Sequence, residues 1–251
     1  MSAWPEGVAA RVLPQTDSTM AEAARRAEDG IPGPEWTLAL HQTAARGRRG
    51  RPWAMPPGNF AASLLMRPRC SPSDGALRSF VAALALRDAL IAAGVPQGDV
   101  ALKWPNDVLL RGGKLAGILL ESQGDGHGGL SHLIIGIGVN LAAAPAPASL
   151  KPDAVRPVSL HETTGIAIAP EPFLDLLAPA LDRYDRQLCA YGFAPIRTAW
   201  LAGAARLGQS ITARLPAGAL TGIFRDMDAA GNLILETAGG RRPIAAAEIF
   251  F

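Results

Sequence analysis

The stretch LKWPNDVLLRGGKLAGILLES, residues 102–122, sets the pattern from which the fold can be predicted. Short turns join three apolar runs in and beside this stretch: VALKW (100–104), DVLLR (107–111) and KLAGILLESQ (114–123). The turn RGGK (111–114) carries the glycine pair typical of a tight hairpin. A further apolar run, SHLIIGIGVNL at 131–141, continues the series. Strands linked by such short turns predict a mostly antiparallel or mixed sheet.

Helical patterns surround this sheet. Residues 18–30 begin with a Ser/Thr cap and end at a glycine, and residues 73–94 place large apolar side chains at helical spacing. Strand-like runs at 36–41 and 59–66 lie between these two helices. Helical periodicity returns over 159–202, where Pro179 is expected to start, kink or break a helix.

The tail from Leu207 has a different character. Four short strand-like runs, QSITARL, ALTGIFRDMD, NLILETA and RRPIAAAEIFF, are separated by glycine-containing turns. This pattern predicts a small β-barrel after the main domain. The expected fold class is therefore α/β, of the α+β type, with a mixed sheet flanked by helices in residues 1–204 and a small β-barrel in residues 205–251.

Composition narrows the functional classes. The chain has 251 residues, of which 49% are hydrophobic, and its two cysteines, Cys70 and Cys189, fit no metal-ligand spacing. The N-terminus lacks the basic start and apolar run of a secretion signal, so we expect a cytoplasmic protein. The long uncharged run at 130–150 contains Pro, Gly, Asn and His, which favour a strand plus a loop over a membrane span.

Positive charge is concentrated in one segment. The formal net charge is +2, but residues 36–73 hold six arginines and no acidic residue, which leaves 18 basic and 22 acidic residues, a net −4, elsewhere. Within HQTAARGRRGRPWAMPPGNF, residues 41–60, glycines separate the arginines Arg46, Arg48, Arg49 and Arg51. Glycine lets a backbone approach a ligand closely, and guanidinium groups match phosphate oxygens two at a time. The segment predicts a phosphate-binding loop, with a nucleic-acid site or a solvated loop as alternatives.

A second cluster contains residue types that are used in catalysis. Lys103, Asn106, Asp107 and Lys114 are polar residues within otherwise apolar strands, so each needs a partner or a function. A capped turn between strands explains the WPND sequence equally well. No P-loop motif occurs in the chain.

The glycines of IIGIGVN, residues 134–140, form the third cluster. Gly136 and Gly138 are two residues apart, so on a strand they face the same way and leave one patch of the sheet without side chains. Such a patch predicts a slot for a ligand, although a tightly packed sheet or a bulge would need the same residues.

Taken together and in this order, the motifs resemble those of the biotin protein ligase family. The resemblance rests on Ser18-Thr19 before the first helix, QTAARGRRGRPW (42–53), LKWPNDVLL (102–110), GGKLAGILLE (112–121) and IGIGVNL (135–141). It implies a class II synthetase-like biotin/lipoate ligase domain followed by an SH3-like barrel. The implied reaction makes biotinyl-5′-AMP from biotin and ATP with Mg²⁺, then transfers biotin to one lysine of a biotin carboxyl carrier domain of a carboxylase.

The resemblance also implies roles for residues. Lys114, Arg48, Arg51 and Asp107 are the expected catalytic residues, with Lys114 as the central cation and Asp107 orienting or deprotonating the incoming lysine. The residues expected to bind biotin are Ser18, Thr19, Gln42, Arg46, Gly117, Gly136 and Gly138, with the valeryl chain in the glycine slot. The residues expected to bind the nucleotide are Arg48, Arg51, Trp53, Asn106 and Asn140. No metal ligand is assigned.

The sequence departs from the family pattern at two positions. Ala45 stands where glycine is common, and Met20 replaces the asparagine often found after Ser-Thr. Some family members carry an N-terminal helix-turn-helix, but only seventeen residues precede Ser18 here. We therefore expect no specific DNA binding, no membrane association, and a monomer or a homodimer.

Two alternative functions are open from the sequence. A lipoate or octanoate ligase or transferase of the same fold would need a longer apolar tunnel and has no reason to retain the arginine motif. An arginine-rich nucleic-acid-binding protein is the alternative from another class, but it leaves Lys114 and the WPND turn without a role.

Overall fold

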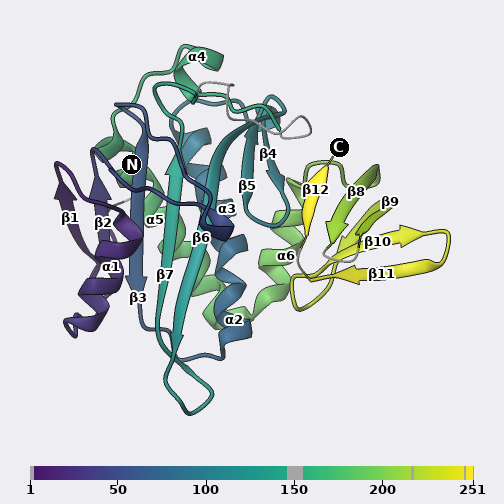
Figure 1. The fold of residues 1–251 in the computed structure, drawn as a ribbon, viewed down its shortest axis with the longest axis horizontal. Coiled ribbons are helices and arrows are strands. Elements are labelled where there is room, and N and C mark those ends of the chain that lie inside the picture. The colour runs from purple at the N-terminus through teal and green to yellow at the C-terminus, as the bar shows by residue number, and fades with distance from the viewer. Residues whose placement is uncertain (1–2, 146–154, 216–217, 246, 251) are drawn as a thin grey trace.

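The computed structural model describes residues 3–145, 155–215, 218–245 and 247–250, and a mixed sheet forms the centre of its larger part (Figure 1). The strands of this sheet are β1 (Ala9–Leu13), β2 (Glu35–Ala39), β3 (Phe60–Met66), β4 (Val100–Lys103), β5 (Asp107–Leu110), β6 (Gly113–Gly124) and β7 (Leu130–Val139). Their spatial order is β1-β2-β3-β7-β6-β5-β4. Only the β1–β2 pair is parallel, so the predicted mixed sheet is confirmed.

Helices cover both faces of this sheet (Figure 1). They are α1 (Thr19–Glu28), α2 (Pro72–Ala76), α3 (Arg78–Ala92), α4 (Leu160–Thr164), α5 (Pro170–Tyr191) and α6 (Phe193–Ala202), with single 3-10 turns η1 (Arg48–Gly50) and η2 (Gln97–Asp99). Helix α1 packs on β3 and β7 from one side, where Met20 and Ala23 meet Leu65 and Ile134. Helix α3 covers the opposite face and is itself backed by α5.

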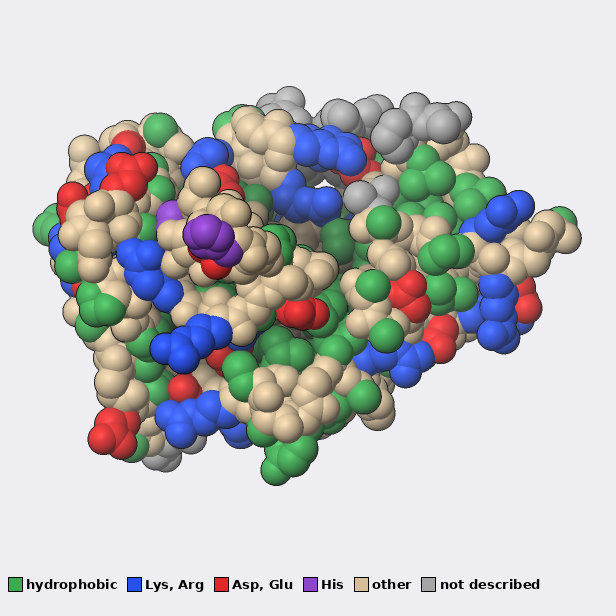
Figure 2. Space-filling view, turned by 90° about the horizontal axis from the view of Figure 1, so that it is seen from below, with side chains coloured by type: hydrophobic (Ala, Val, Ile, Leu, Met, Phe, Trp, Pro, Cys, Tyr) green, Lys and Arg blue, Asp and Glu red, His purple; other side chains and the backbone are tan. Residues whose placement is uncertain are grey.

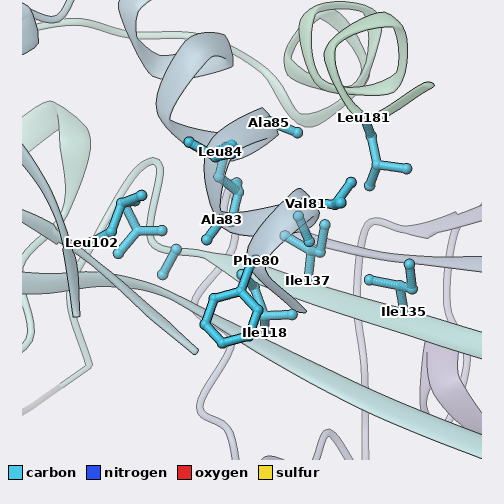
Figure 3. Packing of buried hydrophobic residues seen from close by; sticks show 14 of the residues in the cluster. Phe80, Val81, Ala83, Leu84, Ala85, Leu102, Ile118, Ile135, Ile137 and Leu181 are labelled. Carbon is cyan, nitrogen blue, oxygen red and sulfur yellow. The ribbon is translucent and has the colours of Figure 1, made fainter. Parts of the chain in front are cut away.

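The two faces of β7 are set by simple alternation. Ile135 and Ile137 are buried against α3, together with Ile118 of β6 (Figure 3). Because successive side chains point to opposite faces of a strand, Gly136 and Gly138 face the other side. At residues 135–138, β7 therefore presents large side chains to the core and only glycine hydrogen atoms to the opposite face.

A second, fully antiparallel sheet forms the C-terminal part. Its strands are β8 (Ser210–Leu215), β9 (Gly218–Met227), β10 (Leu233–Thr237), β11 (Gly240–Ile244) and β12 (Glu248–Phe250), in the order β11-β10-β9-β8-β12. It shares its apolar core with the larger part, and Trp104 Nε1 donates to the carbonyl of Gly231 at 2.9 Å. The predicted final strand at 241–251 is in fact two strands, which lie on opposite edges of this sheet.

Two predictions about helices need correction. The expected helix at 73–94 is divided at Leu77 into α2 and α3. Helix α5 runs from Pro170 to Tyr191 without a break at Pro179, which lies inside it. Leu177, Ala178, Ala180 and Leu181 on either side of this proline are buried, so packing offsets the backbone hydrogen bond that proline cannot donate.

The predicted strand in the long uncharged run is confirmed, since β7 occupies Leu130–Val139, while residues 146–150 of that run lie outside the described part. Strand β1 at the sheet edge was not predicted. Within the described segments, no helix has the length and apolar character needed to cross a membrane.

Candidate active site

One row of paired residues crosses the sheet and forms the floor of a pocket. Lys103 of β4 pairs with Asp107 of β5, Asp107 pairs with Gly117 of β6, and Gly117 pairs with Gly138 of β7. Gly138 in turn pairs with Ala61 of β3. Directly opposed residues share one face of a sheet, so the row has two charged residues at one end and almost no side chains in its middle.

A β-bulge places Lys114 on this same face. Lys114 lies three residues before Gly117, and strict alternation would direct the two to opposite faces. The register of β5 and β6 shifts between Val108 and Leu109, however, so that Lys114 opposes Leu109. Bulges often redirect a side chain next to an active site. Here the bulge lets Lys114 Nζ approach Asp107 Oδ1 to 2.7 Å.

The other end of the pocket is lined by neutral polar groups. Ser18 is the N-cap of α1 but makes no capping side-chain hydrogen bond, and it is buried. Gln42 Oε1 accepts from the backbone N–H of Thr19 at 2.7 Å. The Thr19 hydroxyl accepts from Ser63 Oγ at 2.8 Å, and Ser63 is a fully buried residue that the sequence motifs did not indicate.

Side chains of the protein itself lie against the glycines. A Cβ on Gly138 would lie 2.8 Å from Cε2 of Trp53, and one on Gly117 would lie 3.3 Å from Cζ3 of the same ring. A Cβ on Gly136 would lie 2.4 Å from Met20 Sδ. The expected slot therefore exists but is covered by an indole and a thioether. A ligand chain that uses it has to displace Trp53.

Every arginine of the loop at residues 46–51 has a partner. Arg48 donates to Asn106 Oδ1 at 3.0 Å, and Asn106 also donates to the carbonyl of Ile118 at 2.7 Å. Arg46 pairs with Glu121 at 2.8 Å. Burial lowers the pKa of Arg48, because a charged guanidinium loses its hydration in the pocket.

The C-terminal sheet contributes a carboxylate to this loop. Glu248 of β12 forms an ion pair with Arg51 and lies 3.9 Å from Arg49. The loop turns at Arg49 and Gly50, whose φ values are 58° and 68°. The alanine at position 45 is not in the left-handed region, so glycine is not required there by the loop geometry.

These groups enclose one cavity of about 540 Å³. All fourteen residues predicted for the site line it: Ser18, Thr19, Gln42, Arg46, Arg48, Arg51, Trp53, Asn106, Asp107, Lys114, Gly117, Gly136, Gly138 and Asn140. Lining residues that the sequence did not assign include Lys103, Ala61, Glu248, Ile249 and Phe250. The last three come from a strand more than a hundred residues away from the motifs, and no local pattern marks them.

Asn140 lies at the end of β7. Its side-chain N–H donates to the carbonyl of Val158 at 3.0 Å, and its own backbone N–H donates to the carbonyl of Leu115. Its Oδ1 is buried and accepts no hydrogen bond. Buried polar atoms are normally satisfied, so this oxygen is available to a donor on a bound ligand.

Another hollow, of about 640 Å³, lies between α6 and the C-terminal sheet, where Phe193 and Met227 are among its lining residues. It contains none of the motif residues. The face in Figure 2 shows basic and acidic side chains interspersed, without a continuous basic surface. The concentration of site residues therefore distinguishes the first cavity.

Two protein-family models match this chain. Residues 12–140 match the biotin/lipoate A/B protein ligase family, and residues 207–251 match the biotin protein ligase C terminal domain. The biotin–[acetyl-CoA-carboxylase] ligase of Paracoccus denitrificans is 55% identical over 96% of this chain and 99% of the relative. The enzyme of the same name from Mycobacterium tuberculosis is 34% identical over 95% of this chain and 87% of its own length.

A solved structure of similar shape is that of the biotin protein ligase from Aquifex aeolicus in complex with biotin and ATP. It superposes with a TM-score of 0.80 at 25% identity and covers 96% of this chain and 97% of that one. The resemblance seen in the motifs extends over both sheets. The chain belongs to the biotin protein ligase family.

Proposed function

We propose that this protein is an ATP-dependent biotin protein ligase, which activates biotin to biotinyl-5′-AMP and transfers it to a lysine of a biotin carboxyl carrier domain. The observation that carries the proposal is the change in polarity along the cavity of about 540 Å³ that the motif residues line. Its Ser18–Gln42 end offers neutral hydrogen-bonding groups, its middle is floored by glycine, and its far end holds Arg48, Arg51 and Lys114. Biotinyl-5′-AMP consists of a neutral cyclic urea, an aliphatic chain and a phosphate in this order. The three parts of the cavity offer the kind of group that each of them requires.

The neutral end suits the ureido ring of biotin. The hydroxyls of Ser18 and Thr19 and the amide of Gln42 can both donate and accept, as a urea requires. Lipoate and octanoate carry no such polar ring, so they would leave the buried hydroxyls of Ser18 and Thr19 without a ligand partner, at a cost. This end of the cavity therefore supports biotin over the other acids used by related ligases.

In the first step, the biotin carboxylate attacks the α-phosphorus of ATP and pyrophosphate leaves. Two anions must approach each other, and Lys114 with Arg48 and Arg51 can offset both their repulsion and the charge that develops in the transition state. Asn106 holds Arg48 in place. We assign nucleotide contacts to Asn106, Trp53 and Asn140, the last through its unpaired Oδ1.

The donor set does not fit a resident magnesium ion. Asp107 and Glu248 are the carboxylates among the described lining residues of the cavity, and each is paired with a cation. The described part of the chain contains no cluster of three or more His, Cys, Asp or Glu suited to a metal. Magnesium commonly binds mainly to substrate phosphates and water, so we propose MgATP as the substrate.

The second step joins the two parts of the molecule. The carrier lysine attacks the acyl carbon of biotinyl-AMP, where Lys114 can hold the phosphate or carbonyl oxygen. Glu248, Ile249 and Phe250 line the same cavity, so we propose that residues 205–251 form a domain that completes the site made by residues 1–204.

The proposal is tested by incubating the protein with biotin, MgATP and a biotin carboxyl carrier domain. The mass of the carrier is then measured by mass spectrometry. Biotinylation of one carrier lysine is expected, and replacing that lysine by arginine in the carrier should abolish it. Modification with lipoate or octanoate in place of biotin would assign the chain to a related ligase. No modification with any of these acids would contradict the proposal.

A further inference from the structure

Lys103 lies within the motif at residues 102–110, but neither the family resemblance nor the reaction described above gives it a role. It ends β4, opposite Asp107, and its Nζ lies 3.8 Å from Asp107 Oδ2. The other carboxylate oxygen of Asp107 lies 2.7 Å from Lys114 Nζ. Asp107 therefore stands between two lysines in the cavity, one on each of its oxygens.

The two lysines differ in their surroundings. The side chain of Lys114 is 31% exposed, whereas that of Lys103 is 9% exposed and lies behind Asp107. Burial lowers the pKa of Lys103, and the nearby charges of Lys114 and Arg48 lower it further, while Asp107 and Glu248 oppose the shift. The environment of Lys103 thus favours a neutral amine more than that of an ordinary surface lysine does.

The two half-reactions differ in their need for a base. Adenylate formation uses a carboxylate that is already ionised. Transfer begins with a carrier lysine whose ordinary pKa is about 10.4, so its ammonium must lose a proton before it can attack. A relay through Asp107 returns this side chain to its ionised form only when the proton moves on, so the relay needs an acceptor behind Asp107.

We propose that Lys103 is a positioning residue that serves as the terminal proton acceptor of the transfer half-reaction and acts through Asp107. This inference rests on the proposed function. The carrier ammonium gives one proton to Asp107, which passes it to the neutral Lys103 amine. The carrier nitrogen then bonds to the acyl carbon, and the bond from that carbon to the phosphate oxygen breaks. AMP leaves with the electron pair and takes up the second proton of the nitrogen.

The test separates the half-reactions in single-turnover experiments on the full chain. Adenylate formation is followed with biotin and MgATP, and transfer is followed by mixing the isolated enzyme–biotinyl-AMP complex with a carrier domain, from about pH 6 to about pH 10. In the wild type, transfer should reach its plateau at a pH well below the ordinary lysine pKa of about 10.4. A rate that keeps rising to that pH would overturn the proposal without any variant.

Two variants distinguish a proton acceptor from a fixed cation. Lys103→Met should slow transfer at neutral pH by about 10²- to 10⁴-fold, slow adenylate formation far less, and approach the wild-type transfer rate at high pH. Lys103→Arg keeps a cation beside Asp107 but cannot release its proton, so its transfer should be as slow as that of Lys103→Met. Restoration of transfer by arginine would overturn the proposal, as would an equal loss in both half-reactions.

Arg183→Met is the matched control, because Arg183 is an exposed cation on α5 paired with Asp88. The rates of adenylate formation and of transfer by Arg183→Met should equal those of the wild type. Adenylate formation by each variant also shows that the variant has folded. If the wild type itself makes no adenylate, the proposed function fails. If it makes adenylate and Lys103→Met transfers biotin at the wild-type rate, only this inference fails.

Discussion

Strand β7 has two different faces. One face packs in the hydrophobic core and the other faces the cavity, so one strand contributes both to stability and to the candidate site. On one face, Ile135 and Ile137 pack with Ile118 beneath α3 (Figure 3). On the other, Gly136 and Gly138 have no side chains, and the neighbouring strands add Gly117, Asp107 and Lys103. The core face stabilises the sheet by burying apolar area. The pocket face gives up such burial and leaves room for a ligand.

The contrast teaches that stability and catalysis can be altered separately in this sheet. A change on the core face should act on unfolding and leave the reaction of folded molecules nearly unchanged. A change on the pocket face should act on rate or affinity and leave unfolding nearly unchanged.

Lys114→Ala should have the largest effect on adenylate formation. Removing a cation aimed at developing charge typically lowers the rate by about 10²- to 10³-fold, and we expect this loss in single-turnover adenylate formation with little change in biotin affinity. Arg111→Ala is the control, since Arg111 lies in the turn before β6 and pairs with Asp99 outside the cavity. If the adenylation rate of Lys114→Ala is within about threefold of the wild-type rate, Lys114 has no catalytic role in this step.

Ile135→Ala tests the other face of the same strand, because Ile135 is fully buried in the core and does not line the cavity. Truncation of a buried isoleucine should lower the free energy of unfolding by about 2 to 5 kcal/mol, and Ile135→Val should lower it by about 0.5 to 1.5 kcal/mol. Urea unfolding followed by circular dichroism measures both. Under conditions where the variants are folded, their adenylation rates should match the wild type. A rate loss as large as that of Lys114→Ala would show that the two faces are not separable.

Arg48→Gly tests whether the arginine loop at residues 46–51 retains the adenylate in the cavity. Adenylate should still form through Lys114 and Arg51, but it should dissociate faster, because a charge-assisted hydrogen bond worth about 1.5 to 3 kcal/mol is lost. The measurement is the release of biotinyl-AMP and the labelling of lysines on a non-carrier protein. Arg49→Gly, whose guanidinium is exposed and directed to Glu248 at 3.9 Å, should stay closer to wild type. Unchanged retention in Arg48→Gly would mean that Arg48 does not hold the adenylate.

Gly138→Ala should have the smallest effect. The new Cβ would lie 2.8 Å from Trp53, and the methyl group would narrow the slot, so biotin affinity should fall roughly tenfold, or about 1.4 kcal/mol. Stability should be unchanged or slightly lower, because the indole of Trp53 has to shift to make room for the methyl group, which offsets the smaller entropy loss of alanine on folding. Calorimetric titration with biotin measures the affinity. Gly98→Ala, where no atom lies within 4 Å of the added Cβ, should bind as the wild type does.

The sequence predicted those features that depend on local periodicity. The alternation of isoleucine and glycine in IIGIGVN is enough to assign β7 two different faces, and the cap at Ser18 and the glycine at position 30 delimit α1. The pairing of these strands in one sheet also followed from the short turns between them.

Features that depend on contacts between distant segments could not be predicted. The bulge that turns Lys114 toward Asp107 arises from the register of two strands, which the spacing of Lys114 and Gly117 does not reveal. Glu248 reaches the arginine loop only because the C-terminal sheet packs beside β4 and β5 (Figure 1). Pro179 is tolerated inside α5 because its neighbours are buried, a tertiary effect that outweighs its local preference.

The central claim is that the pocket face of the sheet forms an acyl-adenylate from biotin. The most direct measurement is a single-turnover experiment in which enzyme in excess is mixed with biotin and α-labelled MgATP, without any carrier, and the quenched products are separated by chromatography. We predict about one equivalent of enzyme-bound biotinyl-AMP per limiting biotin, and its loss in Lys114→Ala but not in Ile135→Ala. Folded wild-type protein that yields no biotinyl-AMP would contradict the claim.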